Sequence, residues 1–208
     1  MIDIIDISFI NESKSQYGNS EVVKKIDCAL PNDNSFLTSI YRNEKINYPK
    51  FHKMDNLCKA GYLCALSITN NNPYLLNSKS TSVICFNREA SLESDKNYTK
   101  TIIDNDNYFP APALFVYTLP NIVTGEICIS NKIFGESSMY ITENFNCRQI
   151  AQHVIGAFDT KTEYVLAGWL DCLNSRSQAL FMLFGGSKEE HDYEKIMSKL
   201  NTINSKYL

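Results

Sequence analysis

Residues 139–169, MYITENFNCRQIAQHVIGAFDTKTEYVLAGW, contain the alternation on which the fold prediction rests. Two short apolar segments, Met139 to Thr142 and Tyr164 to Trp169, have the composition of buried strands. The stretch between them, Cys147 to Phe158, is predicted to be a helix because its apolar residues recur at helical intervals: Ile150, Ala151, Val154, Ile155 and Phe158. Strands that alternate with helices indicate a layered α/β sheet, in which right-handed crossovers join the parallel strands.

The start of this helix has two candidate caps, Asn144 and Asn146. An asparagine side chain at that position accepts a hydrogen bond from a free amide of the first turn. Further along the chain, Ala179 to Phe184 is predicted to be another buried strand. A charged C-terminal helix is predicted from about Lys188 to Leu200.

The N-terminal part continues the alternation. Ile2 to Phe9 and Thr81 to Phe86 are predicted strands, whereas polar residues dominate between Phe9 and about Asn34. Asp55 to Ile68 is a predicted helix with Asp55 as its cap. Asp104 to Pro112 is too rich in turn formers and prolines for regular structure. The next helix should begin at Pro120 and bury Ile122, Val123, Ile127 and Ile133.

These elements predict an α/β fold with a mixed, mostly parallel five-stranded sheet and helices on both faces. The sequence contains no internal repeat, low-complexity tract or clear linker, so one domain over residues 1–208 is expected.

Composition excludes several function classes. A formal charge of −3 and a pI near 5.6 provide no positive field to attract nucleic acid. The seven cysteines form no C-x-x-C pair, which favours reduced core thiols in the cytoplasm over disulfides or a zinc site. The three histidines also lack metal-ligand spacing, so neither a metal nor a cofactor is expected. Asp3 and Asp6 interrupt the apolar N-terminus, which is therefore neither a signal peptide nor a membrane span.

Several segments, in order, resemble the N-terminal half of β-ketoacyl synthases of the thiolase-like superfamily. These are Pro49-Lys-Phe-His-Lys-Met-Asp55, Pro110-Ala-Pro112, Leu119-Pro-Asn-Ile-Val-Thr-Gly125 with Ile129 to Gly135, Tyr140-Ile-Thr-Glu-Asn144, and Val165-Leu-Ala-Gly-Trp169. The resemblance covers most of the chain from Tyr48 to Gly186. It is strongest to short ketosynthase-like proteins of aryl-polyene and flexirubin-type pigment pathways. It implies a thiolase-like half and a role in fatty-acid, polyketide or polyene-type biosynthesis.

The sequence departs from this family at the nucleophile. A working ketosynthase needs a cysteine at the turn between strand and helix, where the helix N-terminus lowers the thiol pKa. Counting from Gly135 places that position on Asn144, and counting back from Gly168 places it on Glu143. Neither residue has a thiol, and the histidines that the family contributes from its C-terminal half are absent from this sequence.

Two residues keep an enzymatic alternative open. Cys147 lies close after the turn, but His153 is six residues further on and faces another side of a helix, so they cannot form a simple dyad. Cys147 is otherwise a packed helix cysteine. Glu143 could promote decarboxylation, or it could cap the helix. If active, the protein would be an acyl-thioester acyltransferase or decarboxylase that uses Cys147 or Glu143.

The resemblance also predicts partners. Ketosynthases dimerise through the strand before the nucleophile, which places Ser138 to Thr142 and the helix Asn121 to Ile133 at a subunit interface. A homodimer or a heterodimer with a ketosynthase is expected, and an acyl carrier protein is a further candidate partner. The favoured prediction is a non-catalytic accessory subunit, and a small-molecule or acyl-chain binding protein is the other alternative. A half-ketosynthase must also cover its remaining surface with a partner or with polar residues.

Overall fold

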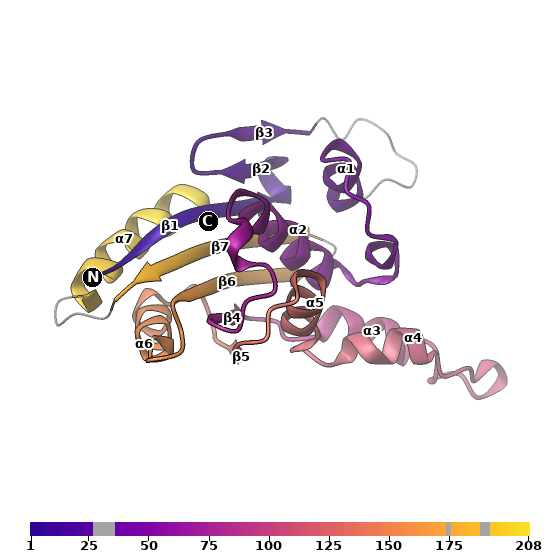
Figure 1. Cartoon of the computed structure of the whole chain (residues 1–208). Coiled ribbons are helices and arrows are strands. Elements are labelled where there is room, and N and C mark those ends of the chain that lie inside the picture. Colours follow the sequence, from indigo (N-terminus) through magenta and orange to yellow (C-terminus); the bar gives the residue numbers. More distant parts are fainter. Residues whose placement is uncertain (27–35, 174–175, 188–191) are drawn as a thin grey trace.

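The computed structural model describes residues 1–26, 36–173, 176–187 and 192–208 (Figure 1). The strands are β1 (Ile2–Asn11), β2 (Gln16–Asn19), β3 (Val23–Lys25), β4 (Thr81–Asn87), β5 (Ser137–Ile141), β6 (Tyr164–Leu173) and β7 (Arg176–Gly186). The α-helices are α1 (Phe36–Asn43), α2 (Asn56–Asn71), α3 (Leu92–Thr99), α4 (Pro112–Phe115), α5 (Ile122–Asn131), α6 (Cys147–Ala157) and α7 (Asp192–Tyr207). Short 3-10 turns include η2 (Pro49–Lys53) and η5 (Val116–Thr118).

The strands of the described residues form one mixed sheet in the order β3-β2-β1-β7-β6-β4-β5. Strand β4 is parallel to β5 and β6, and the other four neighbouring pairs are antiparallel. The prediction of a mostly parallel, five-stranded sheet was therefore wrong. Strand β6 pairs antiparallel with β7, from which two residues separate it in the sequence, and β1 also pairs antiparallel with β7.

The two additional strands come from the region after Phe9, where polar residues dominate and no element was predicted. Strands β2 and β3 have the sequences QYGN and VKK, which contain neither an apolar run nor a clear alternation. They form by extending β1 into an antiparallel meander, so their pairing depends on the backbone of a strand already in the sheet. Sequence periodicity could not reveal them.

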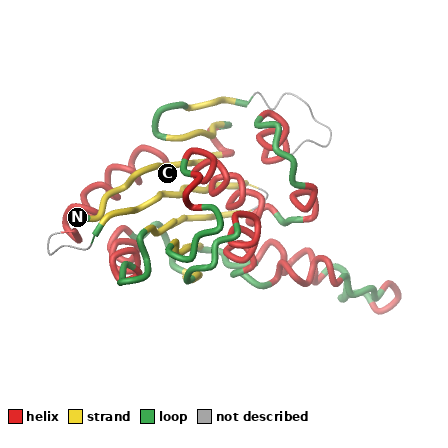
Figure 2. The backbone as a smooth tube through the Cα atoms, viewed as in Figure 1, coloured by secondary structure: helices red, strands yellow, loops and turns green. Residues whose placement is uncertain are grey.

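Helices cover both faces of the sheet, as predicted (Figures 1 and 2). One apolar cluster joins α1, α2 and α5 to the first face, and the other joins α6 and α7 to the second. Strand β4 contributes to both, with Cys85 in the first cluster and Phe86 in the second. Alternate side chains of a strand point to opposite faces, so a central strand packs against both helical layers.

The predicted helix starts can be checked at the caps. The Asp55 carboxylate accepts a hydrogen bond from Cys58 N at 2.8 Å, which confirms Asp55 as the cap of α2. At α6 the cap is Asn146, whose Oδ1 accepts from Gln149 N at 3.1 Å. Helix α5 begins at Ile122, two residues later than predicted from Pro120. It buries Val123, Ile127 and the following Ile133, and partly buries Ile122, as predicted.

Close packing of α2 and α5 depends on Gly61. A Cβ atom added at Gly61 would lie 2.5 Å from Cγ2 of Val123, well inside normal contact distance. The absence of a side chain therefore lets the two helices approach each other on this face of the sheet. This contact fixes the position of α5 beside β5.

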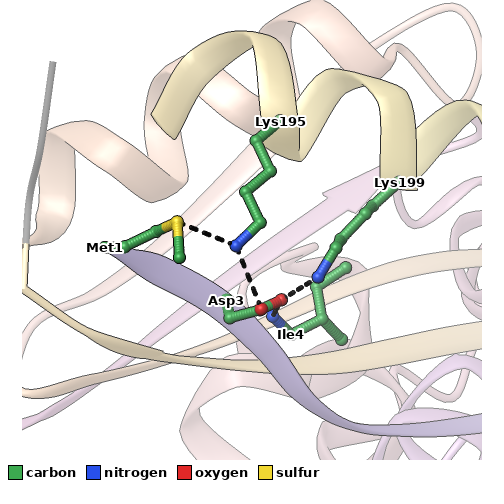
Figure 3. Close-up of polar contacts among 5 residues, drawn as sticks. All are labelled: Met1, Asp3, Ile4, Lys195 and Lys199. Atoms are coloured by element: carbon green, nitrogen blue, oxygen red, sulfur yellow. Dashed lines mark hydrogen bonds and ion pairs between the residues drawn. The ribbon is translucent and has the colours of Figure 1, made fainter. Parts of the chain in front are cut away.

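Helix α7 is tied to the start of β1 by Asp3 (Figure 3). The Asp3 carboxylate accepts a hydrogen bond from Lys195 Nζ at 3.2 Å and forms an ion pair with Lys199. Hydrogen bonding from Lys199 lowers the pKa of Asp3 to about 2, although partial burial opposes the shift. The predicted start of the helix at Lys188 lies outside the described residues, and its end at Tyr207 lies beyond the predicted Leu200.

The segment from α3 to α4 projects from the sheet as an arm (Figures 1 and 2). It contains the Asp104 to Pro112 stretch, which is irregular as predicted apart from a 3-10 turn over Asn105–Asn107 and the first residue of α4. In the described parts of the chain no single helix is long and apolar enough to cross a membrane. The ranges Pro112–Thr118 and Ile122–Asn131 pass that test of length and composition only as a pair bent by 101°.

Candidate functional site

Strand β5 forms one edge of the sheet. It is parallel to β4 in the register Val83↔Ser137 to Asn87↔Ile141, and no described strand pairs with its other side. Its sequence, SSMYI, contains no charged residue and no proline. Natural proteins usually protect a free edge with charges, prolines or bulges. An edge without these devices has backbone groups available for another strand.

The opposite edge of the sheet is protected. Strand β3 is only three residues long and includes Lys24 and Lys25. Lysines on a short edge strand disfavour pairing with another chain because their charges would have to be desolvated. The two edges of this sheet therefore differ in their capacity for strand addition.

Large exposed apolar side chains lie next to the β5 edge. We call them, together with β5, the β5 edge surface; they are Ile129 from α5, Phe134 from the segment between α5 and β5, and Ile141 from β5 itself. Helix α5 packs against β5, which places these elements beside one another. Ile129 is 64% exposed and Phe134 is 66% exposed. Exposed apolar groups that gather in this way mark interaction surfaces.

The turn after β5 contains the predicted nucleophile positions. Thr142 N donates to Asn87 O at 2.8 Å, which extends the β4–β5 pairing by one residue. Glu143 and Asn144 then form an exposed bend, and Thr142 Oγ1 donates to Asn144 O at 3.2 Å. Phe145 packs edge-on against Trp169, with ring centroids 6.2 Å apart. The structure thus places Glu143 and Asn144 together at the tip of the turn.

Cys147 is separated from this tip. It is the first residue of α6 and is buried in the apolar cluster beneath the helix, with 8% of its surface exposed. Burial raises the pKa of the Cys147 thiol above its ordinary value. A buried, protonated thiol is a poor nucleophile, since the thiolate is the reactive form.

His153 has an aromatic environment of its own. Its ring stacks on Tyr140 of β5 at 3.8 Å between centroids and lies 5.8 Å from Phe86. Burial lowers the pKa of His153, which favours its neutral form. No hydrogen bond joins His153 to Cys147 in the described part of the chain. The contact with Tyr140 instead connects α6 to the edge strand.

Polar residues also gather where β4 and β6 end, and sequence patterns did not indicate them. Arg88 donates to Asp171 Oδ2 at 2.7 Å and pairs with Glu89 at 2.9 Å. Asn87 Nδ2 donates to Leu170 O at 2.9 Å. Burial raises the pKa of Asp171, and the charge of Arg88 partly opposes this shift. Asn87 Oδ1 and Asp171 Oδ1 are buried without a hydrogen-bond partner among the described residues, so the internal contacts of this cluster do not satisfy all of its polar atoms.

A buried ion pair supports α5 behind the β5 edge surface. Glu126 is 4% exposed, and its Oε1 lies 2.7 Å from Lys50 Nζ, while its Oε2 is buried without a hydrogen-bond partner among the described residues. Hydrogen bonding to Glu126 raises the pKa of Lys50. Lys50 and Glu126 lie far apart in the sequence, in η2 and α5. Residue spacing therefore could not predict that they form an ion pair.

Within the described ranges, no group of three or more histidine, cysteine, aspartate or glutamate side chains could hold a metal ion. The described cysteines are free thiols, and Cys58, Cys64, Cys85, Cys147 and Cys172 are buried. Cys28 lies outside the described residues.

Comparison with solved structures identifies the architecture. The fold is similar to a chain of the complex described as the ketosynthase (ApeO) with its chain length factor (ApeC) from Xenorhabdus doucetiae. The TM-score is 0.61 at 13% sequence identity, and the match covers 96% of this chain and 91% of that chain. The fold is thiolase-like.

A second solved structure agrees with this result. The ishigamide ketosynthase/chain length factor matches with a TM-score of 0.62 and 12% identity over 91% of this chain, but only 63% of that chain. No protein-family profile matches the sequence. No curated protein matches it in sequence either. The thiolase-like fold therefore persists at a level of identity where sequence comparison alone finds no relative.

Proposed function

We propose that this protein is a non-catalytic, ketosynthase-like accessory subunit of fatty-acid or polyene-type biosynthesis. It acts by pairing with a ketosynthase through the β5 edge surface. The observation that carries this proposal is the uncharged, unpaired edge of β5 beside large exposed apolar side chains. A strand from a partner would satisfy the free backbone groups while its side chains covered the apolar ones.

The turn after β5 supports the non-catalytic part of the proposal. Its tip consists of Glu143 and Asn144, which cannot form an acyl thioester. Cys147 has the required chemistry, but burial keeps its thiol protonated and covered. A carrier-bound acyl group therefore meets no accessible thiol at the turn.

The solved relatives support the choice of partner. Both structures in the comparison are described as ketosynthases with chain length factors, and one match extends nearly end to end over chains of similar length. By analogy, the present chain would occupy one half of a heterodimer and a complete ketosynthase the other. An acyl carrier protein would then reach the complex through the active partner.

The test is a mass measurement of purified complexes. The chain is co-expressed with the ketosynthase produced by the same cell, and eluted complexes are sized by light scattering. Ile141→Lys places a charge on the β5 edge surface, and Val23→Lys is its matched control on the other edge, because both residues are 52% exposed. We expect a one-to-one complex that Ile141→Lys abolishes and Val23→Lys retains.

Two outcomes would argue against the proposal. A stable complex that tolerates Ile141→Lys would exclude the β5 edge surface as its interface. Labelling of the isolated chain by an acyl-thioester analogue, lost on Cys147→Ala, would restore the acyltransferase alternative.

A further inference from the structure

A cavity lies at the opposite end of the sheet from β5, between the β1–β2 pair and helices α1 and α2. Its volume is about 210 Å³. This is smaller than the ~300–1,000 Å³ sites of drug-sized molecules, so the cavity suits a smaller ligand.

The inner part of the cavity is apolar. It is lined by side chains from α1 and α2 and from the segments that flank them: Ile10, Ile40, Ile46, Leu63 and Leu66. Ser67 and Asn70 on α2 add uncharged polar groups to the lining. Such a surface favours a short aliphatic chain, because its burial releases water from apolar groups on both sides.

Three polar side chains converge on the same cavity. The Tyr17 hydroxyl donates to Glu44 Oε1 at 2.7 Å, and Lys24 Nζ lies 2.6 Å from the same oxygen. Tyr17 is more than nine-tenths buried and lies beneath Lys24, whose ammonium is 5.6 Å from its ring centroid. Glu44 Oε2 and the remaining Lys24 hydrogens have no further partner among the described residues.

The titration behaviour of this group agrees with its geometry. Burial and the hydrogen bond to Glu44 raise the pKa of Tyr17, so that its hydroxyl remains protonated. Burial also acts to raise the pKa of Glu44, but hydrogen bonds from Lys24 and Tyr17 outweigh it and lower the pKa. The cavity thus contains a carboxylate and an ammonium side by side.

We infer that this cavity binds a small, uncharged amphiphile with a short aliphatic chain and a head group that both donates and accepts hydrogen bonds, such as a primary amide. An amide N–H can donate to Glu44 Oε2 while its carbonyl accepts from Lys24. A carboxylate head can pair with Lys24 only while it faces the charge of Glu44, and an ammonium head can pair with Glu44 only while it faces the charge of Lys24. In each case attraction and repulsion largely cancel, whereas a neutral amide can bond to both groups.

The site is independent of the proposed pairing. Four strands separate β2 from β5 in the sheet order, so a partner at β5 would not cover the cavity. Failure of one proposal therefore leaves the other intact.

The experiment uses the isotope-labelled full chain and three probes of matched size: pentanamide, pentanoate and pentylammonium. Binding is followed by amide chemical shifts of residues around the cavity. We expect pentanamide to shift them at saturation and each charged probe to bind about tenfold more weakly, because a charged head group can bond to only one member of the Lys24–Glu44 pair.

Substitutions at Lys24 and Glu44 should change which of the three probes the cavity prefers. Lys24→Met removes the ammonium from an exposed edge strand and should strengthen pentylammonium binding several-fold while weakening pentanamide. Glu44→Gln should instead strengthen pentanoate. Lys25→Met is the matched control, because Lys25 is the next residue on the same strand but does not line the cavity, and it should change nothing.

The inference is overturned if none of the three probes shifts the cavity resonances. It is also overturned if wild type binds pentanoate as tightly as pentanamide. Equal effects of Lys24→Met and Lys25→Met would exclude Lys24 from the site, even if Glu44→Gln failed to fold.

Discussion

The α6–α7 layer and the β5 edge surface differ in the polarity of the side chains that they expose to solvent. On α6 the outward residues are polar, among them Arg148, Gln149 and Gln152, and α7 continues with Glu194, Ser198 and Asn201. The β5 edge surface instead exposes Ile129 and Phe134. Solvated polar residues need no partner, whereas gathered apolar ones do.

This difference separates a region of the chain whose surface is covered by polar residues from one that leaves apolar residues exposed. The helical layer after the turn is closed, since α7 packs on α6 and both present polar groups outward. The edge beside α5 is open. From the sequence, the remaining surface was expected to be covered either by polar residues or by a partner. The α6–α7 layer has the polar covering, whereas the β5 edge surface leaves apolar residues uncovered. A partner is therefore expected at β5, not over α6 and α7.

The largest contrast is expected from the same substitution at one isoleucine in each region. Ile150 on α6 is 1% exposed, and Ile129 on α5 is 64% exposed. Ile150→Ala should lower the free energy of unfolding by about 2–5 kcal/mol, because it removes buried methyl groups and leaves a cavity. Ile129→Ala should change it by less than about 0.5 kcal/mol. Urea unfolding of both variants measures the two values.

The same two substitutions should have the opposite order of effects on binding to a partner. Ile129→Ala should weaken a complex formed through the β5 edge surface, whereas folded Ile150→Ala should still form it. If Ile129→Ala proved as destabilising as Ile150→Ala in the isolated chain, the β5 edge surface would have to be covered within the monomer.

A smaller effect is expected at the ion pair that joins η2 to α5, on the face of the sheet opposite the α6–α7 layer. Lys50→Met removes the partner of the buried Glu126 carboxylate, whose other oxygen already lacks one. We expect a loss of about 1–3 kcal/mol, at the low end for a broken buried pair because the Lys50 side chain is 44% exposed. Thermal unfolding measures it, with Lys53→Met as the control.

The control has a physical basis. Lys53 lies in the same 3-10 turn and forms no ion pair within the described residues. A Lys53→Met variant as unstable as Lys50→Met would assign the effect to the turn and not to Glu126.

Sequence patterns predicted the parts of this fold that depend on neighbouring residues. The Asp55 cap, the buried side of α5 and the apolar runs of β4 and β7 all follow from short-range spacing. Strand direction does not, because it depends on which strands meet in space. Strands β2 and β3 were missed since three or four polar residues carry no periodicity, and only pairing with β1 makes them strands.

The candidate site shows the same division. Sequence patterns predicted the strand–turn–helix order here, with Glu143 and Asn144 in the turn and Cys147 close after it, and the structure has this order. How far each of these residues is exposed depends on packing against elements distant in the sequence. The contact of Phe145, in the same segment, with Trp169 of β6 is an example. The Lys50–Glu126 pair and the Tyr17–Glu44–Lys24 group join residues far apart in the chain, and no spacing rule connects them.

The smallest effect is expected at the closed layer, where Asp3 holds α7 against β1. Its folded-state pKa of about 2 is below the ordinary 3.8, so the ion pairs contribute stability above pH 3.8 that is lost as the pH falls through about 2. Because the Asp3 side chain is 44% exposed, solvent screening limits the contribution, and Asp3→Asn should cost about 0.5–1 kcal/mol at pH 7. Urea unfolding at pH 7 and near pH 2 measures the difference, with exposed Glu21→Gln as the control. The two curves for wild type and Asp3→Asn should converge near pH 2, whereas a gap that persists in acid would mean that the substitution does not act through the ionised carboxylate and its lysine partners.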